Sequence, residues 1–206
     1  MTSQTSPSRE STREPTSRDR LLDAGQQLFW HRGFNDVGLT EILKQAGVPK
    51  GSFYHHFASK EGFGVEVVDR FAADSLRTLD SFVEAEQPPL ERLRRFFESQ
   101  HAFYQDNGCQ DGCLLGNFGQ ELAESSDVLR QRIDVHLRRV RSRIEACLVE
   151  AQQRGELAAE LDAPGFADVM LSAWHGALLR MKVEKSLRPI DAFLAFHLPL
   201  VHRDAH

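Results

Sequence analysis

The sequence predicts an all-α protein with two unequal parts, an N-terminal three-helix domain that contains a helix-turn-helix and a larger C-terminal helical domain. Apolar residues recur three or four positions apart along most of the chain, as they do on one face of a helix. No segment alternates apolar and polar residues as a half-buried strand would. Glycine, proline and capping residues divide the periodic segments into helices of ordinary length.

The N-terminal part begins with a tail and continues with three helices. Residues 1–16 are rich in Ser, Thr, Arg, Glu and Pro and lack apolar periodicity, which predicts a disordered tail. The first helix stops at Gly33, and two short helices are expected at about 39–46 and 50–57, on either side of the break at 47–49. The apolar face of the first helix consists of Leu21, Leu22, Leu28 and Phe29.

The larger part is expected to contain six further helices. Ser59 can cap a long helix that runs to about residue 85. The others are expected at about 90–105, 113–125, 128–154, 162–185 and 189–201. We therefore divide the chain into a tail over 1–16, a head over 17–62 and a body over 63–206.

Composition excludes several classes of protein. The chain has 206 residues and a net charge of −5, with eight basic and six acidic residues in 1–60, so its charge gives only weak support for nucleic-acid binding. No apolar stretch is long enough to span a bilayer and no signal region is evident, so we expect a cytoplasmic protein that does not bind membranes. Three cysteines argue for reduced thiols rather than a disulfide framework.

No motif typical of an enzyme, a metal site or a cofactor site is present. The chain lacks a nucleophile elbow, a glycine-rich phosphate loop and a paired-carboxylate pattern. His55 and His56 are adjacent, so their side chains would point about 100° apart on a helix, and no third metal ligand is evident. We expect no catalytic residue, no bound metal and no cofactor.

Residues 39–57 carry the strongest local signal, because two short helices joined by a glycine-containing turn can present the second helix to a DNA major groove. Phe53 and Phe57 are expected in the core. The start and outer side of the second helix then carry groups that reach phosphates or base edges: Lys50, Gly51, Ser52, Tyr54, His55 and His56. Alternatively, these are ordinary polar residues of a surface helix.

The run GVPKGSFYHHFASKE at 47–61 closely resembles the signature of TetR-family regulators, and the resemblance covers about residues 17–65. It implies a bacterial transcriptional repressor that binds a palindromic double-stranded DNA operator as a homodimer and is released by a small-molecule inducer. By position, it implies that Tyr54 and His56 contact the DNA backbone and that Lys60 adds a phosphate contact at a helix N-terminus. Base-edge contacts are expected from Thr40, Lys50, Ser52 and His55. Gly38 stands where many relatives carry a hydroxyl residue.

The same resemblance implies that the body contains the ligand-sensing and dimerisation functions. The last two helices, at about 163–185 and 188–201, would pack against their symmetry mates as a four-helix bundle. The apolar residues expected to supply that surface are Met170, Leu171, Ala173, Trp174, Ala177, Leu178, Met181, Phe193, Phe196 and Leu200. Alternatively, all of them lie inside the protomer.

A narrower resemblance concerns the sensor. Residues 112–117, with Gln120-Glu121 behind them, and residues 177–182 look like a branch of the family that includes the repressor of N-ethylmaleimide reductase and acrylate-responsive repressors. It implies that Cys113 senses electrophiles or oxidants beside Lys182. A cysteine that opens a helix near an ammonium is expected to have a lowered pKa.

Two alternatives remain open for the sensor and one for the protein as a whole. Cys113 can be a small buried residue and Lys182 an exposed charge, or the inducer can be a non-covalently bound small unsaturated or carboxylate ligand. A helical interaction module without DNA is a further possibility. The aromatic residues considered as pocket lining, or else as plain packing, are Phe97, Phe103, Tyr104, Phe118, Trp174 and His175.

Overall fold

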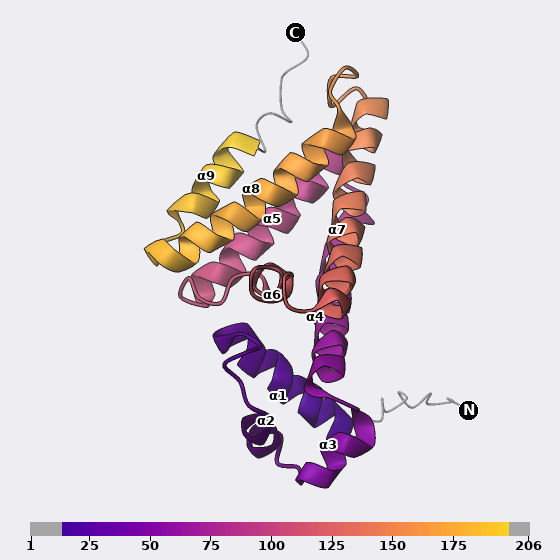
Figure 1. The fold of residues 1–206 in the computed structure, drawn as a ribbon. Coiled ribbons are helices and arrows are strands. Elements are labelled where there is room, and N and C mark those ends of the chain that lie inside the picture. Colours follow the sequence, from indigo (N-terminus) through magenta and orange to yellow (C-terminus); the bar gives the residue numbers. More distant parts are fainter. Residues whose placement is uncertain (1–13, 198–206) are drawn as a thin grey trace, which may run out of the picture.

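The protein is all-α over residues 14–197, the part of the chain that the computed structural model describes (Figure 1). This part contains nine α-helices and no strand, which confirms the predicted fold class. The helices are α1 (Ser17–Arg32), α2 (Leu39–Ala46), α3 (Lys50–His56), α4 (Lys60–Val83), α5 (Pro89–Asp106), α6 (Leu114–Leu122), α7 (Asp127–Gln153), α8 (Ala163–Glu184) and α9 (Arg188–His197).

The predicted boundaries agree with these helices to within a few residues. Gly33 ends α1, Ser59 caps α4 by accepting from the Gly62 N–H, and Gly155 follows α7 in a left-handed conformation. Helix α1 begins at Ser17, where the predicted head begins, and the Thr16 side chain caps it in a reciprocal pair with Asp19. Residues 1–13 of the predicted tail and Leu200 at the predicted end of α9 lie outside the described residues.

A first hydrophobic cluster holds the head together and continues into the body. Phe29 of α1, Phe53 of α3 and Phe63 of α4 are fully buried and pack as an aromatic group with centroids 5.3–5.8 Å apart. Gly25 lets α1 approach α4, because a Cβ at this position would lie 2.3 Å from the Phe63 ring. Phe118 of α6 joins the same cluster, so the core is continuous across the predicted boundary at residues 62–63.

Helix α4 connects the head to the body and packs along α7 (Figure 1). Asp69 of α4 accepts bonds from Arg132 (Nη2, 2.7 Å) and His136 (Nε2, 2.7 Å) of α7. Burial raises the pKa of the Asp69 carboxyl, but these two hydrogen-bond partners outweigh burial and hold it below its usual value of 3.8. The ion-paired cluster therefore stabilises the contact between α4 and α7.

The body has its own core between α5, α7, α8 and α9. Phe97, Trp174 and Phe193 pack around its centre with centroids 4.8–5.2 Å apart, and Phe193 meets the other two rings edge to face. Helices α8 and α9 lie side by side on the outside of α5 (Figure 1), where nothing in the described chain covers their outer faces. Within residues 14–197, no helix combines the length and apolarity that crossing a membrane requires.

Candidate functional site

Helix α3 stands at the far end of the head, at the tip of the molecule (Figure 1). Its inner face is buried through Phe53, and Phe57 directly after it is 3% exposed. Its outer face carries Tyr54, whose side chain is 56% exposed. The predicted contact residues on or near this face are exposed (Thr40, Lys50, Gly51 and His55) or half-buried (Ser52 and His56).

The turn before α3 gives the helix its direction. Gly47 adopts a left-handed conformation (φ 63°) and closes α2, and Pro49 starts α3 from an extended conformation. His56, at the other end of α3, lies 2.8 Å from the Ser17 hydroxyl through Nε2. Helix α3 is therefore fixed at both ends while its outer face stays open, which is the geometry a major-groove reader requires.

Lys60 is the first residue of α4, and its side chain has partners within the head. Its ammonium donates to the Phe34 carbonyl at 2.6 Å and lies 4.4 Å above the Phe34 ring. Burial lowers the pKa of Lys60, against the opposing charge of Glu121. The ammonium is thus directed toward the head's own backbone, and its phosphate contact stays a prediction.

The loop before α6, together with α6 itself, ties the head to the body. The Trp30 indole N–H donates to the Gly112 carbonyl at 2.7 Å, and His31 Nδ1 lies 2.6 Å from Oδ1 of the buried Asp111. On α6, the Glu121 carboxylate accepts from the backbone N–H groups of Phe34 (2.8 Å) and Asn35 (2.6 Å). A change in the loop at 107–113 therefore acts directly on the end of α1.

These contacts were not predicted from the sequence. Gly112 enters the sequence analysis only as the first residue of the run 112–117 that resembles the sensor branch, and Trp30, His31 and Asp111 are not singled out. Their partners lie 80 or more residues away in the chain, so no local pattern identifies them.

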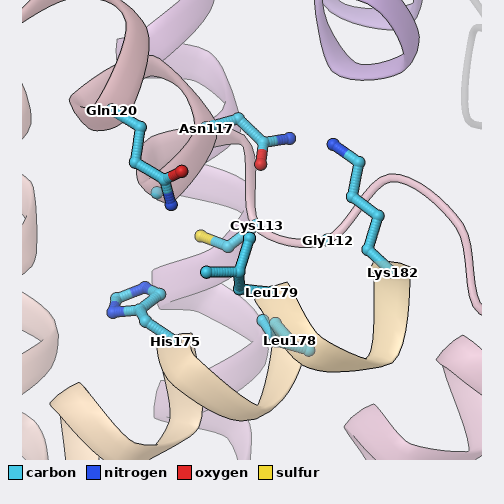
Figure 2. A pocket seen from close by; sticks show the side chains of 9 residues that line it. Gly112, Cys113, Asn117, Gln120, His175, Leu178, Leu179 and Lys182 are labelled. Atoms are coloured by element: carbon cyan, nitrogen blue, oxygen red, sulfur yellow. The ribbon is translucent and has the colours of Figure 1, made fainter. Parts of the chain in front are cut away.

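Cys113 occupies the N-cap position of α6 and lies between the two hydrophobic clusters. It shares a pocket with Lys182 of α8, together with Asn117, Gln120 and His175 (Figure 2). The pocket has a volume of about 20 Å³, which is room for a single water molecule. Cys113 and Lys182 therefore line the same pocket, as the resemblance implied, but this pocket is very small.

The predicted lowering of the Cys113 pKa is wrong. Burial raises the pKa of the thiol, and the N–H groups of Gly116 and Leu115 oppose burial without overcoming it. Figure 2 shows the sulfur directed toward Gln120 and His175, whereas the Lys182 ammonium extends toward Asn117. Burial likewise lowers the pKa of His175, so the ring beside the sulfur favours its neutral form.

The aromatic candidates for pocket lining have different positions. Phe118 is fully buried and packs against Phe29 and Phe34 at 5.7 and 5.8 Å, so it belongs to the core between α6 and the head and not to a pocket. Trp174 is 8% exposed and is a core residue of the body. Tyr104 is also buried, and burial raises its pKa, but it lines a cavity.

That cavity, the α1–α4–α5 cavity, is much larger than the Cys113 pocket. Its volume is about 350 Å³, within the range of small-molecule sites. The side chains that line it include Gln26 and Trp30 of α1, Phe71 and Ser75 of α4, and Phe103 and Tyr104 of α5.

The described residues contain no group of three or more His, Cys, Asp or Glu side chains placed to hold a metal ion.

Comparison with known proteins gives matches over nearly the whole chain. Residues 21–67 match the family described as "Bacterial regulatory proteins, tetR family", and residues 89–196 match "Tetracyclin repressor-like, C-terminal domain". The transcriptional repressor DhaR of Mycobacterium sp. (strain GP1) is 38% identical over 86% of this chain and 88% of its own length. The transcriptional regulator AcuR of Cereibacter sphaeroides is 37% identical over 84% of this chain and 80% of its own length.

A solved structure of similar sequence also matches the fold. The reduced form of NemR from E. coli superimposes with a TM-score of 0.85 at 32% identity and covers 92% of this chain and 99% of that one. A match over 92% of this chain includes both the head and the body.

Proposed function

Because this chain belongs to the TetR family of bacterial transcriptional regulators, we propose that it is a DNA-binding repressor that acts as a homodimer. The two α3 helices, one from each protomer, occupy a palindromic operator until an electrophile or oxidant modifies Cys113. The observation that carries the DNA-binding part is the outer face of α3. Tyr54 is 56% exposed on a helix whose inner face is fully buried, and Lys50 and His55 are exposed beside it. Such an arrangement suits phosphate and base-edge contacts.

The outer face of α8 and α9 supports a homodimer. Apolar side chains remain exposed there at helical spacing, with Val169 54%, Val183 75% and Phe196 72% exposed. Small residues between them, Ala173 and Gly176, line a groove in which another helix can approach closely. Isologous packing of this face against its copy would bury the exposed residues and fix two heads about one DNA turn apart.

The dimer surface differs from the predicted set. Six of the residues expected there are buried inside the protomer: Met170, Trp174, Ala177, Leu178, Met181 and Phe193. The proposed surface keeps Ala173 and Phe196 of that set and adds Val169, Gly176 and Val183.

The position of Cys113 supports its role as sensor. It follows Gly112, whose carbonyl accepts the Trp30 indole N–H, so an adduct on the sulfur would displace the loop that holds α1. When the thiol adds to an activated alkene, the sulfur forms a bond to the β-carbon and the thiol proton is transferred to the α-carbon. This addition needs no further reactant. A pocket of about 20 Å³ cannot hold such an adduct without moving α6 or α8.

The similarity to NemR, whose solved structure is described as a reduced form, also favours a redox-sensitive thiol. A direct Cys113–Lys182 cross-link would require the Lys182 ammonium to turn from Asn117 toward the sulfur (Figure 2). We therefore propose that Lys182 lies beside the sensing thiol without forming a covalent bond to it.

Electrophile-induced release tests this function. DNA from upstream of the protein's own gene is bound in a gel-shift assay, and N-ethylmaleimide is added to the native protein, to Cys113→Ser and to Cys109→Ser as the matched control. The expected result is release of DNA by the native protein and the control but not by Cys113→Ser. Normal release by Cys113→Ser would exclude covalent sensing at this thiol.

A further inference from the structure

The start of α1 is hydrogen-bonded to the end of α3, and the proposed function gives this bond no role. The Ser17 hydroxyl oxygen lies 2.8 Å from Nε2 of His56, although the two residues are 39 positions apart in the chain. Ser17 is the first residue of α1, and His56 is the last residue of α3. The bond therefore reaches a side chain to which the family resemblance assigns a contact with the DNA backbone.

The backbone is held in place on both sides of this bond. Thr16 and Asp19 form a reciprocal cap that fixes the first turn of α1. Phe57 follows His56 directly and is buried in the core of the head. The two backbones therefore have little freedom to move apart, and the Ser17 hydroxyl can fix the rotation of the imidazole ring.

The charged and titratable groups around the His56 ring come from three helices. On α3, the His55 ring lies beside it, with the centroids 5.0 Å apart. On α1, Arg18 lies 5.6 Å from the centroid of the Phe57 ring, and it pairs with Glu66 of α4. Within residues 14–197 no carboxylate bonds to the His56 ring, so the serine hydroxyl decides how Nε2 is paired.

The pairing of Nε2 leaves the other ring nitrogen, Nδ1, for DNA. A phosphate oxygen accepts hydrogen bonds, so the nitrogen that faces it must carry a proton. A serine hydroxyl can both donate and accept. In the neutral ring the hydroxyl donates to Nε2, and the ring proton is then on Nδ1. In the protonated ring the hydroxyl accepts from the Nε2–H, and Nδ1 keeps its proton.

From this geometry we propose that Ser17 is a positioning residue for operator binding, which orients the His56 ring so that its Nδ1–H donates to a backbone phosphate in both charge states of the ring. The inference rests on the proposed DNA-binding function and adds a residue of α1 to it. Ser17 acts through His56 and does not itself contact DNA. A carboxylate in its place would only accept from Nε2, and the neutral ring would then face the phosphate with an unprotonated nitrogen.

A double-mutant cycle tests whether Ser17 acts through His56. Fluorescence anisotropy at pH 7.5 measures binding of DNA from upstream of the protein's own gene by the native protein, Ser17→Ala, His56→Ala and the double variant. We expect Ser17→Ala to weaken binding about three- to tenfold in the native background and less than about twofold in His56→Ala, because the two residues share one hydrogen bond. Equal losses in both backgrounds would mean that Ser17 acts independently of His56, and the proposal would be wrong.

The pH profile separates positioning of the ring from a merely structural bond between α1 and α3. Histidine changes its charge between pH 5 and 8. When the ring is protonated, both nitrogens carry protons and loss of the hydroxyl removes only the orientation; when it is neutral, the loss also removes the preference for a proton on Nδ1. We expect the native protein to bind about tenfold more tightly than Ser17→Ala at pH 8.5 and about threefold at pH 5.5. The same ratio at both pH values would overturn the proposal.

Two further variants are controls for these titrations. Ser17→Thr keeps the hydroxyl and should restore operator binding to within about twofold of the native protein. Ser99→Ala removes a hydroxyl that is also half-buried, donates to the Phe96 carbonyl in the body, and should bind DNA normally. Thermal unfolding of each variant verifies that the head is folded. Binding by a folded Ser17→Thr protein that is as weak as that of Ser17→Ala would contradict a role for the hydroxyl.

The same measurements distinguish failure of this proposal from failure of the proposed function. If the native protein binds no DNA, both are wrong. If the native protein binds its operator and Ser17→Ala binds it equally well at pH 8.5, the DNA-binding function stands and the role of Ser17 is excluded.

Discussion

At the scale of single residues, Tyr54 offers the clearest test of the DNA-binding surface. Its ring is 56% exposed on α3, so removing groups from it should leave the fold unchanged. Tyr54→Phe should lower operator affinity about tenfold through loss of one hydrogen bond to a charged phosphate, and Tyr54→Ala should lower it further. Fluorescence anisotropy with operator DNA measures the affinity, and thermal unfolding should show an unchanged midpoint. Wild-type affinity in Tyr54→Ala would remove Tyr54 from the interface.

The second prediction at this scale concerns the pH dependence of Cys113. Because burial raises its thiol pKa, the thiolate fraction at pH 7 is smaller than for an ordinary cysteine. Alkylation of Cys113 should therefore be slower in the native protein than in urea, and its native rate should still increase about tenfold per pH unit above pH 8. Peptide mass spectrometry after timed treatment with iodoacetamide measures both rates.

The opposite pH dependence of the alkylation rate would contradict this prediction. A native alkylation rate that levels off near pH 7 would mean a lowered pKa, as the position of Cys113 at the start of a helix first predicted. The structure explains why that argument fails. Two backbone N–H groups do oppose the shift, but they act on a sulfur packed between two apolar clusters.

At the scale of helices, Asp69 connects α4 to α7, and its replacement should loosen that contact. Asp69→Asn loses the charge that pairs with Arg132 and His136 and should destabilise the protein by about 1–3 kcal/mol at pH 7. Urea unfolding measures this difference, and Asp134→Asn, whose carboxylate is exposed and pairs only within α7, is the matched control.

The pH dependence of this difference has a defined sign. The folded-state pKa of Asp69 is lowered, so its contribution is complete above the unfolded pKa near 3.8 and is lost as the pH falls through the lower folded value. The gap in unfolding free energy between the native protein and Asp69→Asn should thus stay constant above about pH 5 and narrow below pH 4. A gap that widens on acidification would contradict this assignment.

The helices themselves could be predicted from the sequence because their signals are local. The spacing of apolar residues and the caps at Ser59, Gly33 and Gly155 act within a few positions, and the observed boundaries follow them. The pairing of α1 with the loop before α6 could not be predicted, since Trp30 and Gly112 are 82 positions apart and neither is unusual in its local sequence.

The candidate sites differ in how much of each could be predicted from the sequence, because local patterns can be predicted and long-range contacts cannot. The outer face of α3 follows from helical geometry once the family resemblance identifies the helix. The lining of the α1–α4–α5 cavity depends on which side chains of three separate helices meet, and only Phe103 and Tyr104 were considered from the sequence. Lys60 was assigned a role by position in the family, and its side chain bonds within the head. Phe118 was considered as pocket lining or as plain packing, and it packs in the core.

At the scale of the whole molecule, the proposed repressor needs two heads, and Phe196 tests how they are joined. The ring is 72% exposed on α9, so Phe196→Asp should leave the protomer folded and place a charge in the proposed dimer face. Sedimentation velocity should show a dimer for the native protein and a monomer for the variant, with operator binding lost in parallel. Val128→Asp, at an exposed site on α7, should remain dimeric.

The most direct test of the account is the binding of the native dimer to DNA from upstream of its own gene, measured as a function of salt. We expect binding to a palindrome, at one dimer per site, with an affinity that falls by on the order of a thousandfold or more between 50 and 200 mM salt. Tyr54→Ala should bind far more weakly under the same conditions. Failure of the folded dimer to select any sequence from a random DNA library would contradict the central claim that the outer face of α3 reads DNA.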